Sequence, residues 1–483
     1  MRVRNMNCRL AIQSRWAHGN LRMQNLNVLV ASLLLLASAA VSVGQKAADA
    51  QAAQTKIIPF SWTAADNGYH VIRLTNDPGS SGLESHSNAF TPDGKDMIYR
   101  SEFGIRVLSL ATRKVKTIVP GRVESLAVGT KTRRVFFTRG TDIYLYVADI
   151  DTGAITKVGN LPLRANVMSV NSDETLLVGD NIEGVMDPNY QAFHLMASKE
   201  VGKELKADPT LKLSPDEIEE RTKDEAMKMR AAANIPEDLF TVDLQTGRVT
   251  TILKTTDWIG YAQFSPTDPT LILYTHEGMY YETNRVWTIR SDGSQNQLIH
   301  QRTAKEESAT KEFWSPDGKT IWYEWQKPRN KNFAMVAYDV ATGERRLFKM
   351  EKDQRSISYC LASGGFIVGA GRNSEAARRA ASEPGHLNLQ SKQSIEILYP
   401  VLADRNTLAD PQFSGMFNTH DEMTEAYPDA RYAGWFRRAT IVSMVKNDYT
   451  KLEPNIRVSP DNRLVIFTSN MLGPTYIFAV ELH

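Results

Sequence analysis

The chain has 483 residues, of which 42% are hydrophobic and 23% charged, so it has enough apolar material for a sizeable core and is not a disordered protein. We call residues 1–50 the leader. Without the leader, 51 Lys and Arg residues face 54 Asp and Glu residues, a formal charge of −3 that gives no basic footprint for nucleic-acid binding. Only Cys360 remains outside the leader, which excludes an internal disulfide and a zinc-type cysteine cluster.

The leader is predicted to be a signal peptide. Arginines, the last of them Arg22, precede an apolar run from Val28 to Val43, and small residues typical of cleavage sites follow. This run is shorter than the roughly 20 residues that a membrane-spanning helix needs. An uncleaved anchor is the alternative. Either way residues 51–483 are expected in the periplasm or outside the cell, with no stable membrane span if the leader is cleaved.

Turn-forming blocks recur along the rest of the chain, and most of them precede β-rich runs. They are Thr91–Gly94, Asn171–Glu174, Ser265–Asp268, Ser315–Gly318 and Ser459–Asn462. Their starting points are 80, 94, 50 and 144 residues apart, and all intervals but the first are close to multiples of about 48, the length of a four-stranded propeller blade. Residues 51–483 are therefore predicted to be a single all-β domain, a β-propeller of about seven blades.

A second type of turn-forming sequence lies about half a blade length away from the first. Its copies end in Thr-Gly and lie at Asp151–Gly153, Gln245–Gly247 and Ala341–Gly343. Each copy follows a strand-like run that contains Asp, which is typical of a hairpin turn. Both sets of turns report architecture and carry no chemistry of their own.

One segment, near residues 197–235, is predicted to interrupt the β pattern as a helical insertion between blades. Ser214, Pro215 and Glu217 form a helix start, with Ser at the N-cap, Pro at the first position and Glu at the third. The following run to about Ala233 is rich in Glu, Lys and Met, which favours a helix. Residues 372–392 are predicted to be a second excursion, a loop.

Ionisable residues gather close to two of the turns. They lie in His276-Glu277-Gly278, in Arg285-Val286-Trp287 and in Lys311-Glu312-Phe313-Trp314. In these motifs the chain resembles the oligogalacturonate lyase family, and the likeness extends from His86 to the C-terminal Pro474. The resemblance implies a seven-bladed propeller that cleaves short pectin-derived oligogalacturonates by β-elimination. It also implies a Mn²⁺-type metal held by histidines and a glutamine.

β-Elimination removes the proton beside a uronic acid carboxylate and then expels the 4-oxygen, so it needs a cation at the carboxylate and a base at the proton. The resemblance implies that Arg285 is a catalytic arginine that steadies the carboxylate, and that His276 belongs to the site. Lys311 stands where the family has His, and a partly desolvated lysine near Arg285 is a candidate base. The alternative role for Arg285 is an ion pair with Glu277 or Glu282.

His86 and Arg302 are the candidate substrate-binding residues. His86 lies in a string shared with the family, and Arg302 is a cation suited to carboxylates. A structural hydrogen bond is the alternative for His86, and a surface ion pair is the alternative for Arg302.

The metal ligands that the resemblance implies are substituted in this chain. Tyr359 takes the place of one ligand His, Glu453 and Asn455 take the places of two more, and the ligand Gln aligns near Thr450. Glu453 and Asn455 still offer oxygen atoms to a hard cation. Manganese is therefore not predicted here, and the cofactor stays open.

Two functions from different classes remain. The first is an exported oligogalacturonate lyase-like enzyme whose partner is an acidic oligosaccharide. The alternative is a non-catalytic propeller that binds an acidic oligosaccharide or a protein. The chain has no Gly-x-Ser-x-Gly nucleophile motif, which argues against a prolyl-peptidase-type hydrolase with a propeller and a catalytic domain, and it has no phosphate-binding glycine loop.

Overall fold

The computed structural model describes residues 59–482, apart from 65–66, 141–142, 183–189, 209, 329–331, 352–353, 372–392, 404–422 and 445–451. The leader, the predicted loop at 372–392 and Thr450 lie outside the described residues. The chain divides into two units, Met1–Ile58 and Pro59–His483, and the described residues belong to the second. Among the described residues, no helix has the length and apolar character needed to cross a membrane.

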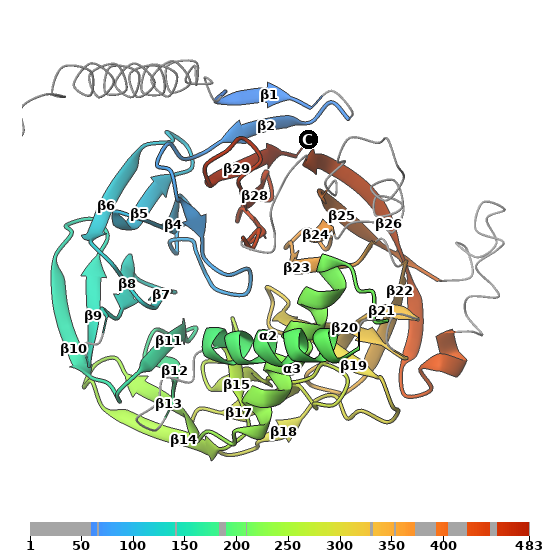
Figure 1. Ribbon diagram of the computed structural model, residues 1–483. Helices are drawn as coiled ribbons and strands as arrows, with labels where there is room; N and C mark the ends of the chain where they lie inside the picture. Colours follow the sequence, from blue (N-terminus) through green and yellow to red (C-terminus); the bar gives the residue numbers. More distant parts are fainter. Residues whose placement is uncertain are drawn as a thin grey trace, which may run out of the picture. The chain divides into compact units, whose positions relative to one another are not determined.

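The second unit consists of seven antiparallel blades arranged as a ring around a central axis (Figure 1). Six blades follow one another from the innermost to the outermost strand. Blade one contains β3 (Ser81–Gly82), β4 (Asp96–Ser101), β5 (Gly104–Ser109) and β6 (Val115–Pro120). Blade two contains β7 (Leu126–Val128), β8 (Arg134–Phe137), β9 (Tyr144–Asp149) and β10 (Ile155–Asn160). Blade three contains β11 (Ala165–Val170), β12 (Leu176–Ile182), β13 (Glu237–Asp243) and β14 (Val249–Thr255).

Blade four contains β15 (Ile259–Phe264), β16 (Leu271–His276), β17 (Val286–Arg290) and β18 (Gln297–Leu298). Blade five contains β19 (Ser308–Trp314), β20 (Thr320–Gln326), β21 (Phe333–Asp339) and β22 (Arg345–Met350). Blade six contains β23 (Ser356–Leu361), β24 (Ile367–Gly371), β25 (Gln393–Leu402) and β26 (Arg431–Met444), and its outer strand pairs in parallel with β22. The predicted all-β propeller of about seven blades is therefore confirmed.

Blade seven closes the ring with strands from both ends of the domain. The C-terminal part supplies β27 (Arg457–Val458), β28 (Leu464–Ser469) and β29 (Tyr476–Glu481), and the N-terminal part supplies β2 (His70–Arg73) with β1 (Ser61–Thr63) outside it. In this pairing Val71 lies opposite Val480 and Arg73 opposite Phe478. This shared blade holds the two ends of the domain together through backbone hydrogen bonds between β2 and β29.

The predicted turn blocks lie between the first and second strands of blades one, three, four, five and seven. The prediction that these intervals are multiples of one blade is partly wrong, and the interval of 144 residues spans two blades where three were expected. The interval of 80 residues spans two plain blades, whereas the interval of 94 residues spans one blade plus the helical insertion. The close agreement of 94 with twice the expected blade length was therefore a coincidence.

The Thr-Gly turns join the third and fourth strands of blades two, three and five. In blade two, Asp149 Oδ1 accepts hydrogen bonds from the backbone N–H and the hydroxyl of Thr152, both at 2.8 Å. The next residue, Gly153, has a φ of 74°, a conformation that glycine adopts without steric cost. These side-chain contacts explain why the Asp, Thr and Gly recur together.

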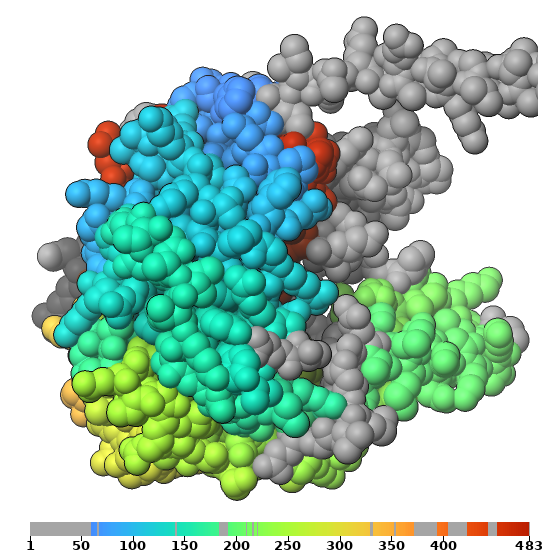
Figure 2. Space-filling model, turned by 90° about the vertical axis from the view of Figure 1, so that its left-hand side faces the viewer, coloured from blue at the N-terminus to red at the C-terminus, as the bar shows by residue number. Residues whose placement is uncertain are grey.

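The helical insertion has two helices, α2 (Tyr190–Ala207) and α3 (Pro215–Ala232). The predicted start of α3 is confirmed, because Ser214 and Glu217 form a complete capping box. The predicted position between blades is wrong. The insertion lies within blade three, since β12 and β13 pair directly and Ile182 lies opposite Glu237 on either side of it. In Figure 2 the helical pair, in green, stands out from one side of the ring.

A buried ion pair anchors the insertion to the blades. Arg230 of α3 donates to Glu237 Oε1, and both side chains are almost completely buried. Glu237 Oε2 accepts the N–H of Ile259 in blade four at 2.7 Å, and the Arg230 guanidinium lies 5.1 Å from the centre of the Trp258 ring. Removing one partner of such a pair leaves an uncompensated buried charge.

We predict that Glu237→Ala lowers the free energy of unfolding by about 3–5 kcal/mol, because Arg230 then lacks its carboxylate. Urea denaturation monitored by tryptophan fluorescence measures the change. The matched control is Glu204→Ala, which removes an exposed ion pair between Glu204 of α2 and Arg221 of α3 and should cost at most about 1 kcal/mol. Equal losses in the two variants would contradict the anchoring role.

Candidate functional site

The innermost strands of several blades carry a β-bulge at the same level. In β11, β15, β19 and β23 one extra residue is inserted relative to the second strand of the blade. A bulge re-aims the side chains next to it and is common beside active sites. In β15 the irregular stretch contains Tyr261, and in β19 it contains Lys311 and Glu312. Lys311 has a φ of 61°, and a non-glycine residue in this region stores roughly 1–3 kcal/mol of strain.

Arg285 is almost completely buried, with 4% of its side chain exposed. Its Nη1 donates to Glu277 Oε2 at 2.6 Å and its Nη2 donates to Glu277 Oε1 at 2.9 Å, a bidentate pair. A second carboxylate, that of Glu312, lies 3.8 Å from Nη2. The ion pair with Glu277 that the sequence offered as an alternative is therefore present. One cation is shared by two carboxylates.

Glu312 is the less well satisfied of these two carboxylates. Its side chain is buried, and its Oε2 has no hydrogen-bond partner among the described residues. Burial raises the pKa of Glu312, Arg285 opposes that rise, and the neighbouring Glu277 adds to it. A buried acid beside a second acid is a common arrangement at functional sites.

Glu324 holds a second charged cluster, between blades five and six. Its carboxylate, which is completely buried, lies 3.4 Å from Lys311 Nζ and 2.8 Å from Arg355 Nε. It also accepts the hydroxyl of Tyr359 at 3.0 Å. The Lys311 ammonium donates in addition to the carbonyl oxygen of Ser356. Here one carboxylate is shared by two cations, the reverse of the arrangement at Arg285.

The two clusters perturb their carboxylates in opposite directions. Burial alone would raise the pKa of Glu324, but the charges of Lys311 and Arg355 and hydrogen bonds from Arg355 and Tyr359 outweigh it and lower this pKa to about 2. The pKa of Glu312 moves upward. Two acids with diverging pKa values in one region are the pattern from which acid and base roles are assigned in enzymes.

His276 is joined to Arg285 through the backbone, since its N–H donates to the Arg285 carbonyl oxygen at 3.0 Å. The His276 ring stacks on Trp287 at 5.0 Å, and its Nδ1 lies 3.3 Å from Asp257 Oδ2. Its Nε2 is buried and has no hydrogen-bond partner among the described residues. Burial lowers the pKa of His276, although Asp257 opposes the change, so the neutral ring is favoured.

His86 comes from the loop between β3 and β4, yet it reaches blade four. Its ring packs edge-on against Tyr261 at 4.4 Å, and its Nε2 lies 3.1 Å from Glu84 Oε2. Tyr261 is 40% exposed, which makes it an accessible aromatic surface. His86 therefore lies with residues of the axial region, as expected for a substrate-binding residue, and it also makes the structural contact that was the alternative.

Glu453 belongs to the same electrostatic region as the residues from blades one and five. Burial raises its pKa, Glu84 adds to the rise, and the charges of His86 and Lys311 oppose it. We use the term axial cluster for the charged side chains that these contacts and charges connect: Glu84, His86, Glu277, Arg285, Lys311, Glu312, Glu324, Arg355 and Glu453.

Arg302 is engaged within its own loop. Its Nε donates to the carbonyl oxygen of Glu307 at 2.9 Å and its Nη2 to that of Ala304 at 3.4 Å. Its backbone N–H donates to Asn284 Oδ1 at 3.1 Å. These contacts stabilise the loop before β19 beside the segment that ends in Arg285. They do not connect Arg302 to the axial cluster.

Two of the side chains at the substituted metal positions, Tyr359 and Asn455, are held by other partners and do not form a site for a divalent cation. The Tyr359 hydroxyl donates to Glu324 and accepts the N–H of Ser356, so it is fully used. Asn455 Nδ2 donates to the carbonyl oxygen of Gly82 at 2.9 Å and clamps blade seven to blade one. Within the described ranges, no group of three or more His, Cys, Asp or Glu is arranged to hold a metal. We therefore assign no reaction step to manganese.

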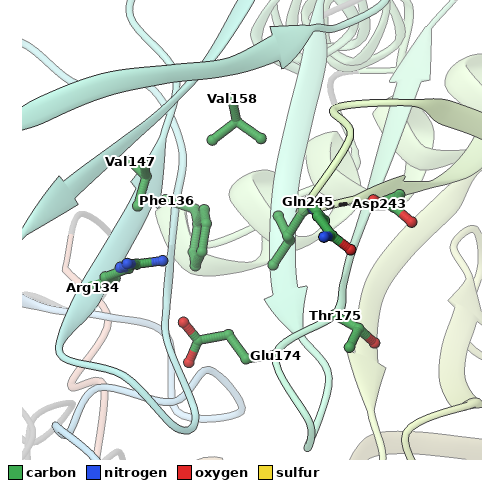
Figure 3. A pocket seen from close by; sticks show the side chains of 9 residues that line it. Arg134, Phe136, Val147, Val158, Glu174, Thr175, Asp243 and Gln245 are labelled. Carbon is green, nitrogen blue, oxygen red and sulfur yellow. Dashed lines mark hydrogen bonds between the residues drawn. The ribbon is translucent and has the colours of Figure 1, made fainter.

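A pocket of about 380 Å³ lies elsewhere, between blade two and blade three (Figure 3). It is lined by Arg134, Phe136, Val147, Val158, Glu174 and Gln245, among others. The Glu174 carboxylate already accepts two backbone N–H groups of the turn at residues 131–132, each at 2.7 Å. Since no predicted site residue lines this pocket, the axial cluster remains the candidate site.

The fold and the cluster define a seven-bladed β-propeller with a charged site formed by inner strands and the loops beside them. Residues 228–385 match the family described as oligogalacturonate lyase. An oligogalacturonate lyase of Dickeya dadantii is 33% identical over 137 residues, which cover 28% of this chain and 34% of that relative. An oligogalacturonide lyase of Pectobacterium atrosepticum is 25% identical over 247 residues, which cover 50% of this chain and 55% of that relative.

Two solved structures share the fold. One is an oligogalacturonate lyase in complex with manganese, with a TM-score of 0.63 and 19% identity over 88% of this chain and 96% of that one. The other is an oligogalacturonate lyase from Vibrio parahaemolyticus, with a TM-score of 0.63, 18% identity and the same coverage. The chain spans about a third and about half of the length of the two curated relatives. The resemblance to the oligogalacturonate lyase family is confirmed, and activity is a separate question.

Sequence reasoning missed several members of the axial cluster. Glu324 and Arg355 were not considered, and Glu312 was read only as part of a motif. Glu324 is a charged residue in a β-rich run of apolar residues, and this contrast is the one sign in the sequence that it has a role in the site. Arg355 lies in no motif. The contact between Glu324 and Arg355 joins blades five and six, so no local pattern connects the two residues.

The pH dependence of stability tests the Glu324 cluster. The folded pKa of about 2 lies below the ordinary value of 4.5, so the stabilising contribution is complete above pH 4.5 and is lost as the pH falls toward 2. We predict that Glu324→Gln costs about 3 kcal/mol at neutral pH and that the difference from wild type shrinks in this window. Chemical denaturation at a series of pH values measures it, and a difference that does not change with pH would contradict the prediction.

Proposed function

We propose that this protein is an exported oligogalacturonate lyase-like enzyme that cleaves short pectin-derived uronides by β-elimination and yields an unsaturated sugar. The observation that carries the proposal is that the segment matching the oligogalacturonate lyase family, residues 228–385, contains the central part of the axial cluster. Arg285, Lys311 and Glu324 all lie within it. The relatives named above are oligogalacturonate or oligogalacturonide lyases, which suggests the same substrate class here.

The chemistry requires few groups, and the axial cluster together with the neighbouring His276 contains candidates for each. A base takes the proton from C5, the electron pair forms the C4–C5 double bond, and the C4–oxygen bond breaks as the leaving oxygen takes up a proton. His276 and Lys311 are the proposed bases. Burial lowers the pKa of His276 and so favours the neutral ring that a base needs, and Lys311 Nζ lies 3.4 Å from Glu324 Oε2.

The other proposed residues shape the site. Arg285 holds Glu277 with both terminal nitrogens and lies next to Glu312, so we propose that it organises this acidic side of the site. His86 and the exposed ring of Tyr261 offer a surface on which a sugar ring can pack. Arg302 contributes through the loop that it stabilises beside Asn284.

One observation favours the second candidate, a propeller that binds acidic oligosaccharides or a protein without catalysis. Arg285 is engaged by Glu277, and two side chains at the substituted metal positions, Tyr359 and Asn455, are engaged by neighbours. Propellers serve many functions, so the fold does not decide between the two.

The first experiment mixes the purified protein with digalacturonate and follows the ultraviolet absorbance of the unsaturated uronide. We expect a rise that is the same with chelator and with added Mn²⁺, because the donor set does not fit a divalent cation. A rise that needs added metal would contradict the metal-independent reaction. No rise with folded protein would support the binding propeller instead.

The same assay assigns the base. We predict that substitution by Ala of the true base lowers kcat by about a hundredfold or more. If His276 is the base, the acidic limb of the pH profile should lie below pH 6.5, because its pKa is lowered. Lys311→Ala is compared with Lys349→Ala, which removes a partly exposed lysine paired with Glu351 on the outer strand β22. Unchanged kcat in both His276→Ala and Lys311→Ala would exclude the two proposed bases.

Export rests on the sequence of the leader, which lies outside the described residues. We predict that the full-length protein, produced in a Gram-negative host, is recovered in the periplasmic fraction and is shortened at its N-terminus. Mass spectrometry of that fraction measures the cleavage point. Full-length protein confined to the cytosol would contradict export.

A further inference from the structure

Arg285 and Arg355 both lie in the axial cluster, but their guanidinium groups are used differently. Both terminal nitrogens of Arg285 bind Glu277, and its side chain is 4% exposed. Arg355 donates through Nε to Glu324 Oε1 at 2.8 Å, and its terminal nitrogens form no hydrogen bond with the described residues. Its side chain is 13% exposed. The two terminal nitrogens, which can bind both oxygens of one carboxylate, are therefore occupied in Arg285. Among the described residues, those of Arg355 have no hydrogen-bond partner.

Arg355 is also held in place. Its guanidinium lies 4.7 Å from the centre of the Phe333 ring, and its partner Glu324 is completely buried. Glu324 in turn accepts Gln326 Nε2 at 2.7 Å and the Tyr359 hydroxyl at 3.0 Å, so the carboxylate that orients Arg355 is itself fixed. An arginine that is ordered before a ligand arrives loses less conformational freedom on binding.

Lys311 brings a second positive charge to the same carboxylate. Its Nζ lies 3.4 Å from Glu324 Oε2, while Arg355 binds Oε1. The strained backbone of Lys311 in the β19 bulge brings its ammonium to the carbonyl oxygen of Ser356, the residue after Arg355. Strain of this kind persists where the surrounding structure fixes it, and it gathers at ligand-binding sites.

We propose that Arg355, oriented by Glu324 and supported by Lys311, binds a carboxylate of the uronide ligand through its two terminal nitrogens. The inference rests on the proposed function for the class of ligand. It assigns to Arg355 the carboxylate contact that the sequence assigned to Arg285. A planar guanidinium matches a carboxylate with two parallel N–H···O bonds, which a lysine does not reproduce.

Calorimetric titration in the presence of chelator tests this assignment. The ligands are trigalacturonate and its methyl ester, which differ in charge but not in the sugar chain. Wild type should bind the acid more tightly than the ester. Arg355→Gln should weaken binding of the acid by about tenfold to a hundredfold and leave binding of the ester unchanged. Arg355→Lys, which keeps the charge, should lose part of the affinity because the paired donors are absent.

The matched control is Arg431→Gln. Arg431 also binds a glutamate through Nε, Glu344 at 2.6 Å, but it is largely exposed on the outer strand β26. This variant should bind both ligands as wild type does. Acid binding that is unchanged in both Arg355 variants would overturn the assignment to Arg355 and leave the proposed function standing. A wild type that binds neither ligand would overturn the inference together with the uronide function.

Discussion

The pairing of β2 with β29 is the interaction on which the axial cluster depends. It joins residues 71–73 to residues 478–480 and closes seven blades into a ring, which fixes the separation of the inner strands. Only in a closed ring does Asn455 reach Gly82, and only then does Glu84, from the opposite end of the domain, help to raise the pKa of Glu453. The cluster is thus a property of the whole ring. Isolated blades would carry the same side chains without bringing them together.

Within the ring, buried charge is balanced in two complementary ways. The Arg285 guanidinium forms ion pairs with two carboxylates, those of Glu277 and Glu312. The Glu324 carboxylate forms ion pairs with two cations, Lys311 and Arg355. Burying charges is costly unless partners compensate for the lost water, and each cluster compensates only part of its own charge with the residues named. The acidic side favours a protonated carboxyl and the basic side favours an anion. An acidic sugar that lies between them would meet both.

Much of the fold was predictable, because turn chemistry is local. The Thr-Gly turns and the Pro-Asp-Gly turns each need particular residues for their backbone angles, so the sequence shows them directly. The position of the helical insertion was not predictable from spacing, since an insertion within a blade lengthens an interval just as an extra blade does. For the site, the motifs supplied Arg285, Lys311 and His86. They did not supply Arg355, because its contact with Glu324 joins two blades and exists only in the folded ring.

The substituted metal positions and the arrangement of cations are best understood as one change. β-Elimination at a uronide needs positive charge beside the carboxylate, and a divalent cation or fixed Arg and Lys side chains can supply it. A metal site needs several donors that are free to face one point. Here the Tyr359 hydroxyl faces Glu324 instead, and Glu324 holds Lys311 and Arg355. Lys311 and Arg355 therefore bring fixed positive charge to this region without a metal, so the substituted positions do not by themselves indicate a loss of function.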